Sequence, residues 1–406
     1  MTPPVRRIFA DRLIDGSGAD PFPATIELQD GVISGVRRGI EGPARDGDLR
    51  LDDLTVIPGL IDAHTHMGIV DDKEDDHVPL AVAAAQIFAN LSEALDAGFT
   101  TVRDVGGLDG GVAAAVARGL VRGPRILPSG PIICEAGGNG DLHSPFCCGA
   151  GRRTQGHPGL SWIGAPCYGP DDARVAARLA LRRGATQLKV SVNTLLTFHD
   201  TGSPDTELTE AELVAVVQEA EAKGTYVTAH ALNADGVALA LRAGVRCLEH
   251  GGIATDAVAT SVAAAGVPLV PTLTNMWLLE QDGNADGRRA RLELEQSLLL
   301  AKAHGVTVGL GSDLEGFGQP RRGMELVLRA QLETPMEAVV AATAVNARIL
   351  RRPELGRVAA GCAADVVALD GDPLADPWIF DDPARVVLVM RSGGIVKDLR
   401  ARAQAG

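Results

Sequence analysis

The middle of the chain alternates between short apolar runs and Ala-rich segments with helical periodicity, and a glycine usually separates the two. Residues 170–183 have the helical pattern, Gly184 follows, and residues 187–192 then alternate with the period of two that a strand has. The same pattern predicts helices at 80–97, 207–223, 234–243, 256–265 and 288–304, and strands at 56–62, 100–104, 125–131, 226–229, 247–250, 268–271 and 307–311. Repeated helix–glycine–strand units are typical of parallel α/β proteins, and about eight strands predict a closed (β/α)8 TIM barrel. A doubly wound sheet is the alternative, but no Gly-x-Gly-x-x-Gly follows the first strand.

Both ends of the chain have a different pattern, in which short strands are separated by turn residues. The expected strands are 6–13, 24–29 and 32–37 at the start, and 365–370, 385–391 and 394–397 at the end. We therefore expect β-rich terminal segments, residues 1–56 and 358–406, around a barrel of residues 57–357.

Composition narrows the class of protein. The chain has 406 residues, 46% of them hydrophobic, which is enough for a large core and more than one compact unit. A net charge of -14 makes a nucleic-acid surface unexpected. The chain offers neither a run of about 18 apolar residues nor an apolar leader near its start, so we expect a cytoplasmic protein without membrane contact.

The six cysteines form no Cys-x-x-Cys pair. Cys147 and Cys148 are adjacent, and a redox pair or a soft metal site is conceivable for them. We interpret them as loop residues.

Polar side chains with metal-binding chemistry stand at the ends of the predicted strands. The first barrel strand runs into His64 and His66, and residues two apart on a strand point the same way, so both imidazoles can hold one cation. His230, His250 and Asp313 each close a later strand. Because active sites of such barrels lie at the carboxyl ends of the strands, we expect these five side chains to converge.

Lys189 stands inside a strictly alternating strand and is expected to face the barrel interior. Burial disfavours an ammonium, and an ammonium has only donors and cannot bind a metal. Reaction of the neutral amine with carbon dioxide gives a carbamate, a carboxylate on a long arm that can bridge two cations. A structural lysine paired with a carboxylate is the alternative. Together with the five strand-end ligands, the pattern predicts a site for two divalent metal ions, and imidazole and carboxylate ligands suit zinc, manganese or iron.

At these positions the chain resembles the amidohydrolase superfamily, almost from end to end. Within that superfamily it is most similar to the branch of Xaa-Pro and Xaa-Arg dipeptidases and imidazolonepropionase-like proteins. The matching segments are Pro58-Gly59-Leu60-Ile61-Asp62-Ala63-His64-Thr65-His66, Thr100-Thr101-Val102-Arg103-Asp104, Lys189, Ala229-His230-Ala231, Glu249-His250-Gly251, Gly311-Ser312-Asp313, Gly356-Arg357-Val358, Ala363-Ala364-Asp365 and Gly371-Asp372-Pro373.

The resemblance implies a role for each ligand. His64, His66 and Asp313 would hold the first metal, His230 and His250 the second, and N6-carboxylated Lys189 would bridge them together with a hydroxide. We expect zinc. Asp313 would act as the general base and then the general acid in hydrolysis of a peptide-like or N-acyl amide C–N bond. The resemblance also implies a small β-sandwich domain built from both chain ends, and a homo-oligomer.

The chain departs from the dipeptidase-like branch near the expected substrate. A Gly-Gly-His-Gly-Asp loop is common in that branch, but here it reads Gly137-Gly138-Asn139-Gly140-Asp141, and Leu232 replaces a His or Tyr two residues after His230. Both changes remove contacts suited to a free carboxylate, so the small-molecule or peptide substrate need not be a simple dipeptide. Residues 133–168 form a long loop region, and such loops shape specificity over barrel mouths. We predict that Asn139, Asp141, His143 and Asn275 line the pocket.

Other functions on the same fold stay open at this point. One is a peptide-tailoring amidohydrolase of a natural-product pathway. Others are a cyclic-amide hydrolase, a deaminase or a lactonase; deaminases of this superfamily usually hold one metal and lack the bridging lysine, so Lys189 disfavours them. A non-catalytic scaffold is unexpected, because all six ligand positions are filled.

Overall fold

The computed structural model describes residues 5–70, 78–142, 156–193, 206–316 and 319–400. These residues form two compact units. The first contains Met1–Asp62, Leu91–Val102 and Gln319–Gly406, and the second contains Ala63–Asn90 and Arg103–Gly318. The predicted domain boundaries at 56/57 and 357/358 stay a prediction.

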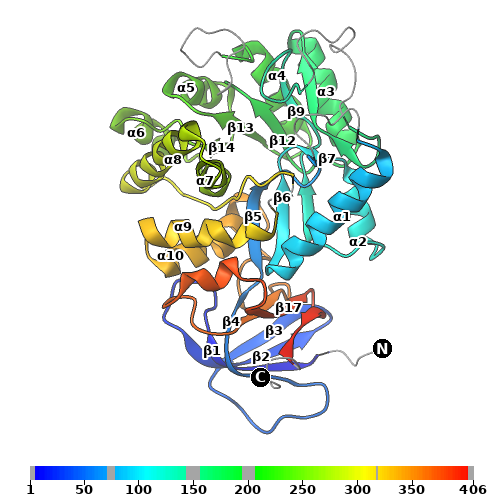
Figure 1. Ribbon diagram of the computed structural model, residues 1–406, viewed down its shortest axis with the longest axis vertical. Helices are drawn as coiled ribbons and strands as arrows, with labels where there is room; N and C mark the ends of the chain where they lie inside the picture. The colour runs from blue at the N-terminus through cyan, green and yellow to red at the C-terminus, as the bar shows by residue number, and fades with distance from the viewer. Residues whose placement is uncertain (1–4, 71–77, 143–155, 194–205, 317–318, 401–406) are drawn as a thin grey trace. The chain divides into compact units, whose positions relative to one another are not determined.

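The first unit is built on one sheet that both ends of the chain share. The sheet runs in the order β18-β17-β16-β4-β1-β2-β3, so strands from the start and the end of the chain belong to the same sheet (Figure 1). Its strands are β1 (Arg7–Leu13), β2 (Phe22–Gln29), β3 (Val32–Arg38), β4 (Leu49–Pro58), β16 (Val366–Leu369), β17 (Val386–Arg391) and β18 (Gly394–Asp398). β4 joins the two ends, because it pairs parallel with β1 and antiparallel with β16. Alternate side chains from both ends, among them Ile8, Leu51 and Leu388, fill one buried core, which confirms the predicted terminal β domain.

The first unit also holds the last helices of the chain. These are η3 (Gln319–Gly323), α9 (Met324–Leu332), α10 (Pro335–Val340), η4 (Ala341–Val345), α11 (Asn346–Ile349) and η5 (Pro377–Asp381). A capping box of Thr334 and Glu337 begins α10. Arg322 is fully buried and is held by Asp62 and Gln319, so this cationic side chain stabilises the unit without reaching solvent.

The prediction of one strand at 56–62 is wrong, because the chain breaks at Gly59 between β4 and β5 (Leu60–Thr65). A side chain at position 59 would overlap the side chain of Thr100, and the Gly59 N–H donates to the carbonyl of Asp365 at 2.9 Å. The apolar run therefore serves two sheets in turn, which the period of hydrophobic residues alone does not reveal.

The second unit contains the carboxyl ends of the barrel strands. β5-β6-β8 form one sheet and β11-β9-β12-β13-β14-β15 another. The strands introduced here are β6 (Phe99–Asp104), β7 (Gly107–Leu108), β8 (Arg125–Pro128), β9 (Ile132–Glu135), β10 (Ser161–Trp162), β11 (Gly164–Cys167), β12 (Leu188–Ser191), β13 (Val227–Ala231), β14 (Cys247–His250) and β15 (Leu269–Val270). All β9–β15 neighbours in the larger sheet pair in parallel.

The predicted strand at 307–311 is not a regular strand, but its backbone closes the ring. Leu269 N–H donates to the Thr307 carbonyl at 3.0 Å, and Gly309 N–H donates back to Leu269 at 2.8 Å. On the other side, Ala63 N–H donates to the Leu310 carbonyl at 3.0 Å. The TIM-barrel fold with an added sheet domain, predicted from the sequence, is confirmed.

Helices lie outside the strands of this unit, as Figure 1 shows for α3 to α6. The helices are α1 (Leu80–Asp96), α2 (Gly110–Ala117), α3 (Pro170–Arg182), α4 (Glu210–Ala222), α5 (Ala234–Ala243), α6 (Asp256–Ala265), α7 (Leu273–Gln281) and α8 (Ala285–Ala303). A capping box of Thr209 and Glu212 begins α4. The sequence did not predict α7, which follows β15 directly and therefore starts at the active end of the barrel.

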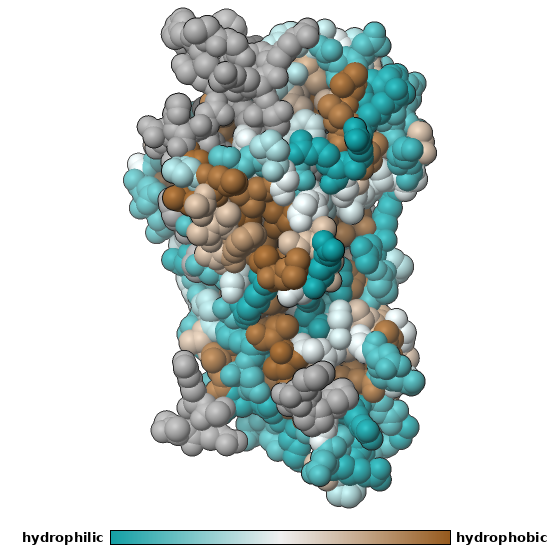
Figure 2. All heavy atoms as spheres, turned by 90° about the vertical axis from the view of Figure 1, so that its right-hand side faces the viewer, coloured by the Kyte–Doolittle hydropathy of each residue, from teal (hydrophilic) through white to brown (hydrophobic). Residues whose placement is uncertain are grey.

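The surface mixes polar and apolar side chains, and apolar ones gather on part of the face in Figure 2. Exposed large apolar residues of the described chain include Leu80, Val82 and Leu120. Within the described residues, no helix has the length and hydropathy that crossing a bilayer requires. The cytoplasmic location and the homo-oligomer stay predictions, and Cys147 and Cys148 lie outside the described residues.

Candidate metal centre

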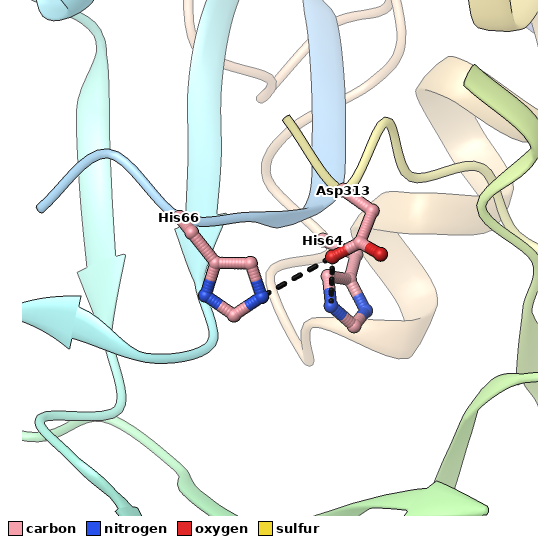
Figure 3. A group of neighbouring side chains, drawn as sticks. All are labelled: His64, His66 and Asp313. Atoms are coloured by element: carbon pink, nitrogen blue, oxygen red, sulfur yellow. Dashed lines mark ion pairs between the residues drawn. The ribbon is translucent and has the colours of Figure 1, made fainter. Parts of the chain in front are cut away.

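His64, His66 and Asp313 converge at the carboxyl end of β5. Nε2 of His64 lies 3.0 Å from Oδ1 of Asp313, and Nε2 of His66 lies 3.2 Å from the same oxygen (Figure 3). One ligand atom from each residue falls within 4.8 Å of the others, and all three residues are buried. Two imidazoles and a carboxylate around one point are a donor set that suits zinc and similar cations.

The ring of His66 is fixed so that Nε2 faces the carboxylate. Nδ1 of His66 lies 2.8 Å from the carbonyl oxygen of Gly106, which only accepts, so Nδ1 carries a proton. A lone pair on Nε2 and a carboxylate oxygen attract each other only with a proton or a cation between them. The Asp104 carboxylate accepts backbone N–H groups of Met67 and Leu108 at 2.8 and 3.0 Å, which fixes this loop. Burial raises the pKa of Asp104 to about 6.

Asp313 is held as a carboxylate. Burial acts to raise its pKa, but the neighbouring His64 and His250 outweigh burial and hold the pKa well below its usual range. The backbone of Asp313 is left-handed, with φ of 56°, and its N–H donates to the His64 carbonyl at 2.8 Å. This conformation is strained for a residue with a side chain, and such strain is typical of functional sites.

His230 on β13 and His250 on β14 continue the cluster. Their ring centroids lie 4.4 Å apart, and the His250 ring lies 4.6 Å from that of His64. Burial, and then the positive charge of Lys189, lowers the pKa of His230 to about 3, so this imidazole is neutral and able to bind a metal. Nε2 of His230 is buried and makes no hydrogen bond within the described part of the chain.

His250 reaches the interior through an irregular backbone. Glu249 already faces the interior, where it contacts His64, so a regular strand would turn His250 outward. A φ of 71° at His250 breaks the alternation, and both side chains lie inside. Nδ1 of His250 lies 2.8 Å from the hydroxyl of Thr272 and 3.6 Å from Oδ2 of Asp313.

Lys189 is 1% exposed, on β12. Burial lowers the pKa of its amine to about 8, although the charges of Glu249 and Asp313 act to raise it. The Lys189 charge in turn lowers the pKa values of His230 and His250, as expected if its amine lies among these rings. A buried amine that is partly neutral near pH 8 can react with carbon dioxide.

Of the predicted substrate residues, Asn275 contacts a member of the cluster. It is half-buried on α7, and its amide Nδ2 donates to Oδ2 of Asp313 at 3.5 Å. Asp141 is buried, and its carboxylate accepts the Gly137 N–H at 3.0 Å. This hydrogen bond stabilises the loop 137–141, to which Asp141 itself belongs. His143 lies outside the described residues.

The loop that contains Asn139 is fastened to β12 by Glu207. Oε1 of Glu207 accepts the Asn139 N–H at 3.0 Å and the Ser191 hydroxyl at 2.8 Å. A Cβ at Gly138 would overlap the Glu207 carboxylate, so glycine at this position lets the two segments touch. Ser191 lies two residues beyond Lys189, so this contact fixes the loop beside the cluster.

The sequence patterns gave no role to several residues that support the cluster, namely Arg103, Glu207, Glu249 and Thr272. Arg103 and Glu249 belong to the segments on which the family resemblance depends. Each is a charged residue at an inward position of an apolar strand, and this pattern could have indicated a supporting role. For Glu207 and Thr272, nothing in the local pattern distinguishes them from ordinary loop residues.

Known proteins resemble the chain over nearly its whole length. The ochratoxinase of Aspergillus niger is 30% identical, covering 96% of this chain and 86% of its own, and an imidazolonepropionase of Salinispora tropica is 24% identical over 86% of each. A crystal structure of a prolidase complexed with N-methylphosphonate-L-proline superposes with a TM-score of 0.84 at 31% identity, covering 97% of this chain and 99% of that one. The model of the amidohydrolase family matches residues 55–396. This chain therefore belongs to the amidohydrolase family.

Proposed function

We propose that the protein hydrolyses a peptide-like or N-acyl amide bond with the help of two divalent cations, which we expect to be zinc. The observation that carries the proposal is the meeting of His64, His66 and Asp313 within 4.8 Å, next to two further buried imidazoles. Family membership makes a hydrolase of amide-type bonds the expected class.

The nitrogen and oxygen atoms of these side chains are better placed to bind cations than to form hydrogen bonds with one another. With Nδ1 of His66 donating to Gly106, its Nε2 faces Oδ1 of Asp313 at 3.2 Å, where either a proton or a cation has to lie between the two atoms. Burial acts to lower the pKa of His66, but Asp313 outweighs burial and raises this pKa. The buried Nε2 of His230 lacks a hydrogen-bond partner in the described chain. His64, His66 and Asp313 would hold one cation and His230 and His250 the other. A carbamate on Lys189 would contribute the bridging carboxylate.

The residues then divide the work of hydrolysis. Two cations, when bound, supply hydroxide near neutral pH and polarise the substrate carbonyl. The Asp313 carboxylate, whose pKa lies well below its usual range, takes the proton that the attacking hydroxide carries and delivers it to the leaving nitrogen. Asn275 bonds the second carboxylate oxygen and so orients Asp313.

The substrate class is broader than dipeptides. The similar proteins include an ochratoxinase and a prolidase, so proteins similar to this chain act on more than one kind of substrate. Here Asn139 and Leu232 offer no cation for a free carboxylate. We therefore propose that the substrate is an amide, and that the part of it that lies next to the loop 137–141 carries no free carboxylate.

A substrate screen with a metal analysis tests the proposal. The zinc-loaded protein is offered N-acyl amino acids, dipeptides and modified peptides, and bound metal is counted by mass spectrometry. We expect about two zinc ions per chain and release of an amine from at least one amide series. One zinc with release of ammonia would instead identify a deaminase, ester cleavage alone a lactonase, and no bound metal would refute the proposal.

A further inference from the structure

A buried ion pair lies directly beneath the metal centre. Arg103 and Glu249 are both fully buried, and Nη2 of Arg103 donates to Oε1 of Glu249 at 2.6 Å. Oε2 of Glu249 lies 2.6 Å from Nδ1 of His64. Nε of Arg103 also donates to the carbonyl of Ala63, the residue before His64. The pair therefore holds both the ring of His64 and the backbone next to it by hydrogen bonds.

We infer that the Arg103–Glu249 pair is the positioning device of the centre, which fixes the proton of His64 on Nδ1 and so places the lone pair of the ring on Nε2, the atom that would bind a cation. The inference rests on the proposed metal-dependent function. A carboxylate only accepts, so Nδ1 of His64 must donate to it. In a neutral imidazole the other nitrogen then carries the lone pair, and here that nitrogen faces Asp313 at 3.0 Å.

The surroundings of Glu249 explain why this position needs a carboxylate and not an amide. Its Oε1 accepts from Arg103, from the Thr228 hydroxyl and from the Cys247 thiol, the last at 3.3 Å. Its Oε2 accepts from His64. Both oxygens are therefore occupied as acceptors, and a glutamine has only one acceptor oxygen.

The donors around Oε1 decide which way a glutamine would turn. Arg103 is permanently charged and has no acceptor, so the amide oxygen must face it and the amide nitrogen must face His64. Nδ1 of His64 would then have to accept, and the proton would move to Nε2. In Glu249→Gln, Arg103 would therefore fix the orientation of the amide at position 249. Through that amide it would fix the tautomer of His64.

The test compares Glu249→Gln with the double variant Arg103→Met, Glu249→Gln. Without the guanidinium, the Thr228 hydroxyl can accept from the amide, so the amide can turn its oxygen back to His64. Glu219→Gln is the matched control, because Glu219 is a buried carboxylate that pairs with Arg174 and Arg178 between α3 and α4.

Two measurements are made on the full-length chain. The first is the imidazole tautomer of His64 in metal-free protein, from ¹⁵N–¹H correlation spectra at a pH where the ring is neutral. The second is zinc affinity by competition with a chromophoric chelator. We expect Nε2–H and a roughly 10- to 100-fold weaker zinc site in Glu249→Gln. In the double variant we expect Nδ1–H and at least partial return of affinity, and in Glu219→Gln no change in either.

The outcomes separate this inference from the function on which it rests. If the unaltered chain binds no zinc, the proposed function fails first. If it binds zinc while Glu249→Gln keeps Nδ1–H and full affinity, the positioning role is wrong. If Glu249→Gln does not fold, the double variant still decides through both measurements, because Nε2–H there together with the zinc affinity of the unaltered chain would show that the tautomer of His64 does not set the strength of the site.

Discussion

The buried amine of Lys189 leads to a quantitative prediction for carbamate formation. In that reaction the neutral Nζ attacks carbon dioxide, a C–N bond forms, and one proton leaves to solvent. Only the neutral amine reacts, so at constant dissolved carbon dioxide the rate follows the neutral fraction. With a pKa of about 8, this fraction is about 9% at pH 7, 50% at pH 8 and 91% at pH 9.

The expected rate therefore rises about tenfold from pH 7 to pH 9 and then levels off. An ordinary lysine, with a pKa near 10.4, would show about a hundredfold rise over the same two units and no plateau. At pH 7.5 the lowered pKa makes the amine roughly one-quarter neutral, compared with about one part in a thousand for an ordinary side chain.

The assay uses metal-free protein and ¹³C-labelled bicarbonate, with total bicarbonate adjusted at each pH to keep dissolved carbon dioxide constant. Carbamate is read from its ¹³C signal after zinc traps it. Lys189→Met provides the background from the chain's N-terminus and from its four other lysines. A signal equal to that background would refute the assignment of Lys189 as a carbamate-forming ligand. A rate that keeps rising tenfold per unit through pH 9 would show that burial does not lower the pKa of this amine.

Three further predictions follow from contacts described above. Asp313→Asn is expected to retain zinc, measured by mass spectrometry, while kcat/KM falls by about 10²–10⁴, and near-normal turnover with metal bound would show that another group moves the proton. Gly138→Ala, whose Cβ would overlap the Glu207 carboxylate, should raise KM more than it lowers kcat, because the loop holding Asn139 shifts; unchanged steady-state constants would remove this loop from the substrate site. Arg178 and Arg174 hold the pKa of Glu219 at about 2, so this carboxylate stabilises the fold above its unfolded pKa near 4.5 and loses that effect as pH falls toward 2. Because the Arg178 side chain is 65% exposed, Glu219→Gln should lower the free energy of unfolding in urea by only about 0.5–1 kcal/mol at pH 7, and a difference that stayed constant down to pH 3 would contradict this.

The fold was predictable because its local signals agree with one another. Helical periodicity, a glycine at the helix end and a short apolar strand recur along the chain, and the helix at 170–183 with Gly184 became α3 as expected. The break at Gly59 had a local signal in Pro58-Gly59, a dipeptide that marks turns, but the apolar residues on both sides favoured one continuous strand. The packing of Thr100, which leaves no room for a side chain at position 59, becomes visible only in the structure. The helix α7 was missed because residues 273–281 lack a strong amphipathic pattern.

The sequence predicted which strand-end residues belong to the candidate site, but it did not predict how their side chains are oriented or held. His64 and His66 follow the period of a strand, whereas His250 reaches the interior only because its backbone is left-handed. No sequence rule announces such a residue when it is not glycine. The supporting pair Arg103–Glu249 depends on two strands far apart in the chain, so its partners become visible only once the barrel closes.

The shared terminal sheet has a consequence for how the chain is made. β4 ends at residue 58 and its partner β16 begins at residue 366, so about 300 residues must be translated between them. At synthesis rates of about 5–20 residues per second, β4 waits roughly 15–60 s on the ribosome with one edge unpaired. Nascent chains, and any product of premature termination, would therefore present an unpaired strand edge, the kind of surface through which strands of separate chains pair with one another.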